Sequence, residues 1–121
     1  MAPPTLLPPS LEGWPVTVSH DLDDVAPKVD VLYLLRMQRE RMTEALLPSL
    51  REYTARYGLT DRRIDDLADE AIVMHPGPMN RGVEISATAA DLDRTVVVDQ
   101  VRNGVAVRMA VLFDLLGSGT P

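Results

Sequence analysis

The sequence contains no cysteine, few aromatic residues (4%), and no apolar run of the roughly 20 residues that a transmembrane helix needs. Without cysteine there is no disulfide, no thiolate metal ligand and no thiol nucleophile, and two isolated histidines do not make a zinc site. The start of the chain lacks the basic residues and the continuous apolar segment of a secretory signal. We therefore expect a cytoplasmic protein that has no membrane as a partner.

Basic residues are also few, since 12 Lys and Arg stand against 18 Asp and Glu, for a net charge of −6. This balance argues against nucleic acid as a partner, because a broad phosphate-binding surface needs an excess of positive charge. The chain does have 45% apolar residues over 121 positions, which is enough for one small globular domain. Any anion site must therefore be local.

The apolar segments predict an α/β fold. Residues 29–35 and 71–74 are short, almost continuous apolar runs, which are typical of parallel strands covered on both faces. Residues 16–19 predict a further short strand, followed by a helical turn over residues 20–26. A helix with Pro48 in its first turn should end at Gly58 in the left-handed conformation, and Thr60 should cap the next helix.

Residues 96–116 predict a long helix, although Asn103 and Gly104 would normally mark a turn. Helical periodicity favours a helix over a turn, because the large apolar residues gather on one side of the helix. Arg108 falls among them, so its side chain either reaches water at the edge or meets a carboxylate. The tail, residues 118–121, is expected to be disordered.

Two predicted strands are each followed by a polar or irregular segment, at the edge where open parallel sheets bind ligands. After the first strand, Arg36 offers a planar fork of donors for a carboxylate or phosphate, and Gln38 can point to the same side of an extended backbone. From spacing alone, an exposed ion pair between Arg36 and Glu40, beside a solvated Arg41, is the more common arrangement. Spacing does not decide between a small-anion site and this surface pair.

The second strand leads into His75-Pro76-Gly77-Pro78. The two prolines fix the backbone, while Gly77 lets a ligand approach without a side chain in the way. A cis bond before Pro78 fits such a loop. The alternative interpretation is a rigid turn without a ligand, and His75 itself is expected to be a neutral side chain satisfied by the protein.

Three segments resemble the aspartate carbamoyltransferase family. Residues 31–42 (VLYLLRMQRERM) resemble its aspartate-loop signature, residues 75–85 (HPGPMNRGVEI) its proline loop, and residues 100–110 (QVRNGVAVRMA) its last helix. The sibling ornithine enzymes have a cysteine where this chain has Pro76, so aspartate is the implied co-substrate. The resemblance implies that residues 1–117 form a partial, Rossmann-like aspartate-binding domain, a doubly wound parallel sheet in three layers that lacks its first strand and helix.

The family transfers a carbamoyl group from carbamoyl phosphate to L-aspartate, giving N-carbamoyl-L-aspartate and phosphate in pyrimidine biosynthesis, without a metal or organic cofactor. The resemblance implies that Arg36 binds an aspartate carboxylate with the help of Gln38. Gly77 and Pro78 would present backbone groups to the carbamoyl moiety and the aspartate amine, across a cis bond. The implied supporting residues are Glu40, which would orient Arg36, together with Arg41 and Pro76.

The resemblance covers only the C-terminal part of such an enzyme, without the carbamoyl-phosphate domain and its Ser-Thr-Arg-Thr phosphate loop. Implied partners are therefore that missing domain, L-aspartate, carbamoyl phosphate and, as the family forms homotrimers, other catalytic chains. Arg108 would face the missing domain or pair with an acidic residue such as Glu84. Because the reaction depends on holding two anionic substrates together, we predict no turnover by this chain alone.

An alternative from another functional class is a non-catalytic remnant or interaction module. Such a protein would use its edge strand and its last helix to associate with itself or with an intact subunit. Binding of L-aspartate that depends on Arg36 would favour the first hypothesis, and association without ligand binding would favour the second.

Overall fold

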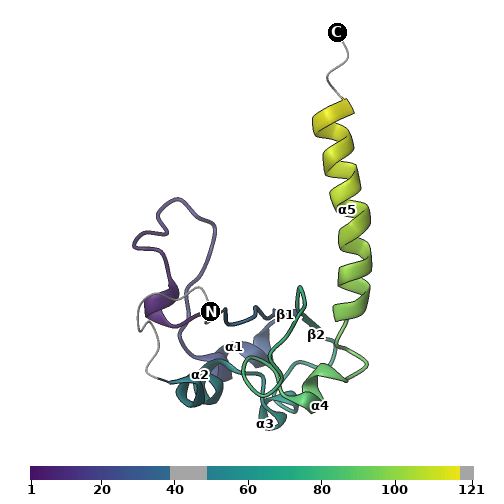
Figure 1. Ribbon diagram of the computed structural model, residues 1–121. Coiled ribbons are helices and arrows are strands. Elements are labelled where there is room, and N and C mark those ends of the chain that lie inside the picture. The colour runs from purple at the N-terminus through teal and green to yellow at the C-terminus, as the bar shows by residue number, and fades with distance from the viewer. Residues whose placement is uncertain (39–48, 118–121) are drawn as a thin grey trace.

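A computed structural model describes residues 1–38 and 49–117 of the chain. Its strands β1 (Val31–Tyr33) and β2 (Ile72–Met74) form a parallel sheet in which Leu32 lies opposite Val73. The short helices gather on one side of these strands, whereas the long helix α5 (Val97–Gly117) projects away on the other (Figure 1). The described part of the chain is therefore α/β, with a small parallel sheet and helices.

Each of the short α-helices follows a residue whose side chain can cap it. The remaining described elements are the 3-10 helices η1 (Pro4–Leu6) and η2 (Ala26–Lys28) and the α-helices α1 (Leu22–Val25), α2 (Leu50–Tyr57), α3 (Asp61–Ile64) and α4 (Ala87–Ala90). Asp21, Ser49 and Ser86 each accept a hydrogen bond from a backbone N–H in the first turn of α1, α2 and α4. Thr60 occupies the predicted capping position of α3, but its hydroxyl makes no capping hydrogen bond.

One apolar core joins the sheet to these short helices. It contains Leu22, Ala26, Leu32, Leu34, Leu59, Ile64, Leu67, Ala71, Val73, Ile85 and Ala89. Val73 lies at its centre, because β2 is bordered by β1 on one side and by residues 94–96 on the other. The Val73 N–H donates to the Arg94 carbonyl, and the Val73 carbonyl accepts from the Val96 N–H, both at 2.9 Å.

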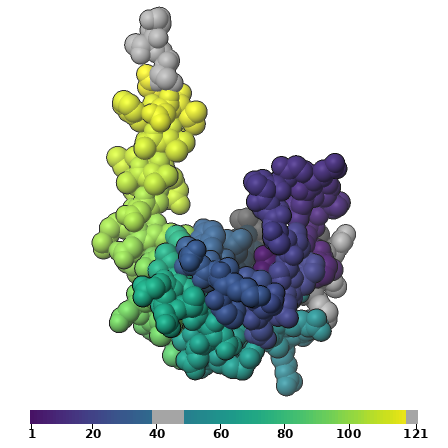
Figure 2. Space-filling model, turned by 180° about the vertical axis from the view of Figure 1, so that it is seen from behind, coloured from purple at the N-terminus to yellow at the C-terminus, as the bar shows by residue number. Residues whose placement is uncertain are grey.

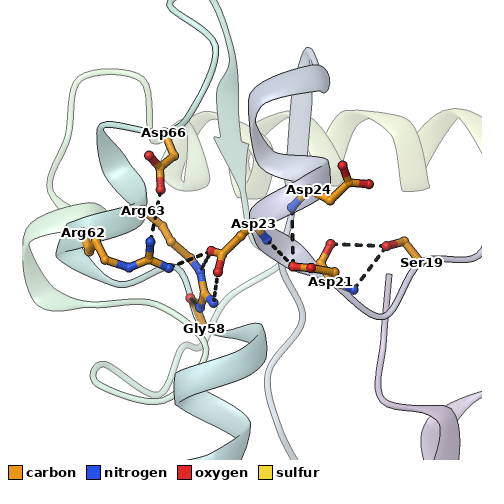
Figure 3. Close-up of polar contacts among 8 residues, drawn as sticks. All are labelled: Ser19, Asp21, Asp23, Asp24, Gly58, Arg62, Arg63 and Asp66. Carbon is orange, nitrogen blue, oxygen red and sulfur yellow. Dashed lines mark hydrogen bonds and ion pairs between the residues drawn. The ribbon is translucent and has the colours of Figure 1, made fainter.

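A polar cluster fastens α1 to α3 (Figure 3). The guanidinium of Arg63, whose residue is only 3% exposed, donates from Nε and Nη2 to the Asp23 carboxylate, and from Nη1 to the Gly58 carbonyl at 2.8 Å. Arg62 adds a third hydrogen bond to the same carboxylate, at 2.8 Å. These arginines, Arg63 first, hold the pKa of Asp23 below its usual value.

Two predictions about strands are wrong. Residues 16–19 do not form a strand, and both Val16 and Val18 are exposed, because strand propensity alone does not order a segment that has no neighbouring strand to pair with. β1 is not covered on both faces, since Val31 and Tyr33 are 45% and 52% exposed. Successive strand residues point to opposite faces, and in β1 only Leu32 reaches the core.

The prediction that Gly58 ends its helix is correct, but the predicted left-handed conformation of this residue is wrong. Helix α2 ends there, but Gly58 has φ −78°, which is not left-handed. Glycine is needed here because a side chain has no room. A Cβ at Gly58 would lie 2.6 Å from the Val83 carbonyl oxygen and 2.8 Å from that of Thr54. Close packing of two backbone segments therefore requires glycine here.

The long helix predicted for residues 96–116 is confirmed as α5. No residue of α5 is buried, and Figure 2 shows it standing as a separate column beside the body of the molecule. None of the helices described within residues 1–38 and 49–117 is long and apolar enough to cross a membrane. The predicted tail at residues 118–121 lies outside the described residues.

Candidate functional site

The segment that follows β1 lies along a cavity of about 660 Å³. Arg36 and Gln38 are both half-buried and both line this cavity, so the two side chains singled out from the sequence share one space. Tyr33, Tyr53 and Tyr57 line it as well. A guanidinium, an amide and phenol groups around one cavity are suited to a small ligand that carries carboxylates.

Burial raises the pKa of the Tyr53 phenol, and the negative charge of Glu84 raises it further. Tyr53 therefore stays neutral and can donate a hydrogen bond well above neutral pH. The rings of Tyr53 and Tyr57 pack in a tilted arrangement with their centroids 5.6 Å apart, and both line the α2 side of the cavity. Sequence reasoning did not assign either tyrosine to a site.

Glu40 and Arg41 lie outside the described residues. The same holds for the alternative ion pair between Arg36 and Glu40, so the supporting roles implied for Glu40 and Arg41 stay predictions.

The proline loop forms the second part of the candidate site. Gly77 has φ +61°, a conformation that favours glycine, and its N–H donates to Nδ1 of His75 at 2.9 Å. Pro76 and Pro78 are exposed. The predicted cis bond between Gly77 and Pro78 is wrong: this bond is trans, and the left-handed conformation of Gly77 turns the chain instead.

His75 and Glu84 form a buried pair behind this loop. Their side chains are 0% and 1% exposed, and Nε2 of His75 lies 3.3 Å from Oε1 of Glu84. Because Nδ1 of His75 accepts the Gly77 N–H, the ring proton is on Nε2 and faces Glu84. Nε2 is not aligned for a hydrogen bond, however, so His75 is satisfied at one ring nitrogen only, and Oε2 of Glu84 has no hydrogen-bond partner in the described structure.

The two loops meet at a single described hydrogen bond. The side-chain amide of Asn80 donates from Nδ2 to the Met37 carbonyl oxygen at 3.1 Å. The structure therefore brings the segment of Arg36 and Gln38 next to the proline loop, as parallel strands predict. Gly77 and Pro78 do not line the cavity that holds Arg36 and Gln38, so the loops are neighbours without sharing that space.

Gln100 connects α5 to the carboxyl ends of both strands. Its Oε1 accepts from the His75 N–H at 3.0 Å, and its Nε2 donates to the Tyr33 hydroxyl at 3.1 Å. Of the two alternatives left open for Arg108, pairing with Glu84 is wrong, because Glu84 is buried beside His75 while Arg108 is exposed on α5. Sequence reasoning did not single out Gln100, because its two partners lie 25 and 67 residues away in the chain.

Metal ligation has no candidate in the part of the chain that is described: no group of three or more His, Cys, Asp or Glu residues lies close enough together there to hold a metal ion. Within the described residues, the site consists of the Arg36 guanidinium, the side-chain amides of Gln38 and Asn80, tyrosine hydroxyl groups and backbone groups.

These features define an α/β domain whose candidate ligand site lies at the carboxyl ends of parallel strands. Over residues 10–115 the chain matches the family described as aspartate/ornithine carbamoyltransferase, Asp/Orn binding domain. It is 61% identical to the aspartate carbamoyltransferase catalytic subunit of Acidothermus cellulolyticus, over 100% of this chain and 38% of that relative. The chain belongs to the aspartate/ornithine carbamoyltransferase family, as the three motifs predicted.

Solved structures agree with this assignment. The chain is similar to aspartate transcarbamoylase from Trypanosoma cruzi in complex with carbamoyl phosphate and aspartate, with a TM-score of 0.64 and 36% identity over 78% of this chain and 30% of that one. The same enzyme with N-(phosphonacetyl)-L-aspartic acid gives a TM-score of 0.65 and 38% identity, over 78% and 29% of the two chains. The chain therefore spans only a part of the proteins it resembles.

Proposed function

We propose that this chain supplies the L-aspartate half of a carbamoyl-transfer site. The observation that carries the proposal is that Arg36 and Gln38, which follow the carboxyl end of β1, line one cavity. A guanidinium binds a carboxylate through two parallel hydrogen bonds, and an amide two residues further on can bind the same ligand. The relatives solved with aspartate and with N-(phosphonacetyl)-L-aspartic acid support this choice of ligand.

In the proposed reaction, the amine of L-aspartate attacks the carbamoyl carbon of carbamoyl phosphate. A C–N bond forms, the C–O bond to phosphate breaks, and the amine loses a proton, giving N-carbamoyl-L-aspartate and phosphate. Arg36 and Gln38 hold the amino acid, while Gly77 and Pro78 present backbone groups to the amine and the carbamoyl group. Pro76 supports the loop by fixing its backbone.

We further propose that the chain does not catalyse this reaction alone. The sequence contains no Ser-Thr-Arg-Thr phosphate loop, and the rate of a two-substrate transfer depends on holding both anions in place. The proposed partners are a carbamoyl-phosphate domain and further catalytic chains in a homotrimer, in the cytoplasm. In that assembly the two described strands would belong to a doubly wound, three-layer sheet.

Calorimetric titration of the chain with L-aspartate tests the proposal. We expect weak binding that Arg36→Ala abolishes, because a truncated side chain leaves the carboxylate without its donor fork. Arg102→Ala is the matched control, since Arg102 is an exposed arginine of α5 whose described ion pair is with Asp99. L-asparagine, which lacks the side-chain carboxylate, should bind more weakly than L-aspartate.

Two results would contradict the proposal. One is the absence of L-aspartate binding to the folded chain, and the other is equal binding by the Arg36→Ala variant. Formation of N-carbamoyl-L-aspartate from both substrates by the chain alone would contradict the predicted inactivity, and it is measured by separating the product chromatographically.

A second candidate function, that of an interaction module, is favoured by α5. Its Phe113, Leu115 and Leu116 are at least 72% exposed, and exposed apolar side chains of this size favour association. Analytical ultracentrifugation, together with the calorimetric titration, distinguishes the two candidate functions. A chain that self-associates and does not bind L-aspartate would favour the interaction module.

A further inference from the structure

Two buried titratable side chains, His75 and Glu84, have no part in the proposed binding of L-aspartate. Taking a carboxyl group and an imidazole out of water is unfavourable unless the structure uses their polar atoms. Both do bind backbone groups, and these belong to one turn. The Gly77 N–H donates to Nδ1 of His75 at 2.9 Å, and the Asn80 N–H donates to Oε1 of Glu84 at 2.5 Å.

The pair therefore holds the turn at both ends. Gly77 and Asn80 are three residues apart, and the two side chains that receive their N–H groups lie 3.3 Å from each other. Because the groups that receive these bonds are buried, water competes poorly for them, and the bonds are stronger than they would be at the surface. The position of Asn80 is thus fixed by a buried unit rather than by the exposed prolines.

From this fixed position, Asn80 reaches the other loop. Its Nδ2 donates to the carbonyl oxygen of Met37 at 3.1 Å, across a sequence separation of 43 residues. Met37 stands between Arg36 and Gln38, and it is itself buried. The bond holds the peptide group between Met37 and Gln38, which is the backbone that determines how the Arg36 and Gln38 side chains face.

We propose that Asn80 is a positioning residue for L-aspartate binding, held in place by a clamp made of His75 and Glu84. This inference rests on the proposed function, because the ligand is the one assigned to Arg36 and Gln38. Two side chains at positions i and i+2 share one side of the chain only while the backbone between them stays extended. Asn80 holds that backbone in place. Small displacements of the Arg36 and Gln38 side chains would weaken their hydrogen bonds to a ligand.

The test compares L-aspartate binding by the wild-type chain and by the variants Asn80→Asp and Asn80→Ala. The first replaces the Nδ2 donor by an oxygen without changing the size of the side chain, and the second removes the amide. We expect Kd to rise roughly 2- to 12-fold, the range that corresponds to the loss of one hydrogen bond. Asn103→Ala in α5, at an exposed position, is the matched control and should leave Kd unchanged.

Hydrogen exchange supplies a readout that does not need the ligand. We expect exchange in peptides covering residues 31–38 to become faster in the Asn80 variants, and exchange in α2, residues 50–57, to stay as in the wild type. A general loss of stability would raise both rates. If Asn80→Ala does not fold, as shown by circular dichroism, Asn80→Asp and the exchange data carry the test.

The outcomes separate this inference from the proposed function. If the wild type binds L-aspartate, Arg36→Ala abolishes binding and the Asn80 variants bind like the wild type, the positioning role is overturned while the proposed function stands. If the wild type does not bind L-aspartate, the proposed function fails, and the positioning role for that ligand fails with it. Exchange in residues 31–38 that is unchanged by the Asn80 variants overturns the coupling between the loops in either case.

Discussion

Arg63 and Asp23 lie 40 positions apart in the sequence, yet the buried guanidinium of Arg63 binds the exposed carboxylate of Asp23. The arrangement is asymmetric, because the side chain of Arg63 is 4% exposed and that of Asp23 is 46% exposed. A buried positive charge depends on its partner far more than an exposed negative charge does. The bond therefore matters for stability mainly through what happens to Arg63 when Asp23 is lost.

We predict that Asp23→Asn lowers the free energy of unfolding by about 1–3 kcal/mol, since the buried guanidinium of Arg63 loses the negative charge and one of the two oxygens to which it donates. Urea denaturation followed by circular dichroism measures this change. Asp24→Asn is the control, because Asp24 pairs with Lys28 and both side chains are well exposed, so the expected change is at most about 0.5 kcal/mol. Equal effects of the two substitutions would contradict the prediction.

Acid should remove the contribution of Asp23. Its pKa is lowered in the folded protein from the ordinary value of 3.8, mainly by the hydrogen bond from Arg63. A carboxyl with a depressed folded-state pKa stabilises the fold above its unfolded-state pKa, and this stabilisation is lost as the pH falls through the folded-state pKa. The difference in unfolding free energy between wild type and Asp23→Asn should thus be full at pH 7 and smaller below pH 3.8. A difference that stays constant across this range would refute the assignment.

Gly58 and Gly104 should respond in opposite ways to alanine. At Gly58 a Cβ would come within 2.8 Å of two backbone oxygens, so we expect Gly58→Ala to destabilise the protein by roughly 1–3 kcal/mol. At Gly104, inside α5, the nearest atom to a Cβ is the flexible end of Arg108 at 3.4 Å, and Gly104→Ala should stabilise the helix by about 0.5–1 kcal/mol. Thermal unfolding monitored by circular dichroism compares the two variants, and destabilisation by both would contradict the second expectation.

Gly77→Ala tests the left-handed turn of the proline loop. A Cβ has room there, since its nearest neighbour is Cγ2 of Val101 at 3.8 Å, so the cost is the backbone conformation at φ +61°, about 1–2 kcal/mol. Gly13→Ala has a similar φ of +79° in open space and should cost about as much. Only Gly77→Ala should also shift the NMR signals of the His75 ring, because only Gly77 donates to it. An unshifted His75 signal in Gly77→Ala would count against that hydrogen bond.

The sequence was sufficient for elements whose signal is local. The two apolar runs gave β1 and β2, the period of the last segment gave α5, and Thr60 gave the start of α3. Parallel pairing of the strands then predicted that Arg36 and the proline loop would be neighbours, and the hydrogen bond between Asn80 and Met37 is consistent with this. The motifs in these loops also led to the correct family.

The features that sequence reasoning missed depend on contacts between distant segments. Nothing near Arg63 in the sequence shows that Asp23 will meet it, and nothing near Glu84 shows that it will be buried beside His75. The failed strand at residues 16–19 has the same origin, because a strand needs a partner as well as propensity. The roles of Arg36, Gln38, Gly77 and Pro78 stay predictions until ligand binding is measured.

The attachment of α5 at its start makes the helix a lever arm. Gln100 and the backbone of Val96 fasten the first turn to the strands, and the rest of the 21-residue helix extends for about 25 Å beyond this fulcrum (Figure 1). A tilt of about 10° at the first turn would carry the far end through roughly 4 Å. Because Gln100 also accepts the N–H of His75, whose ring in turn accepts the N–H of Gly77, such a tilt would act directly on the proline loop.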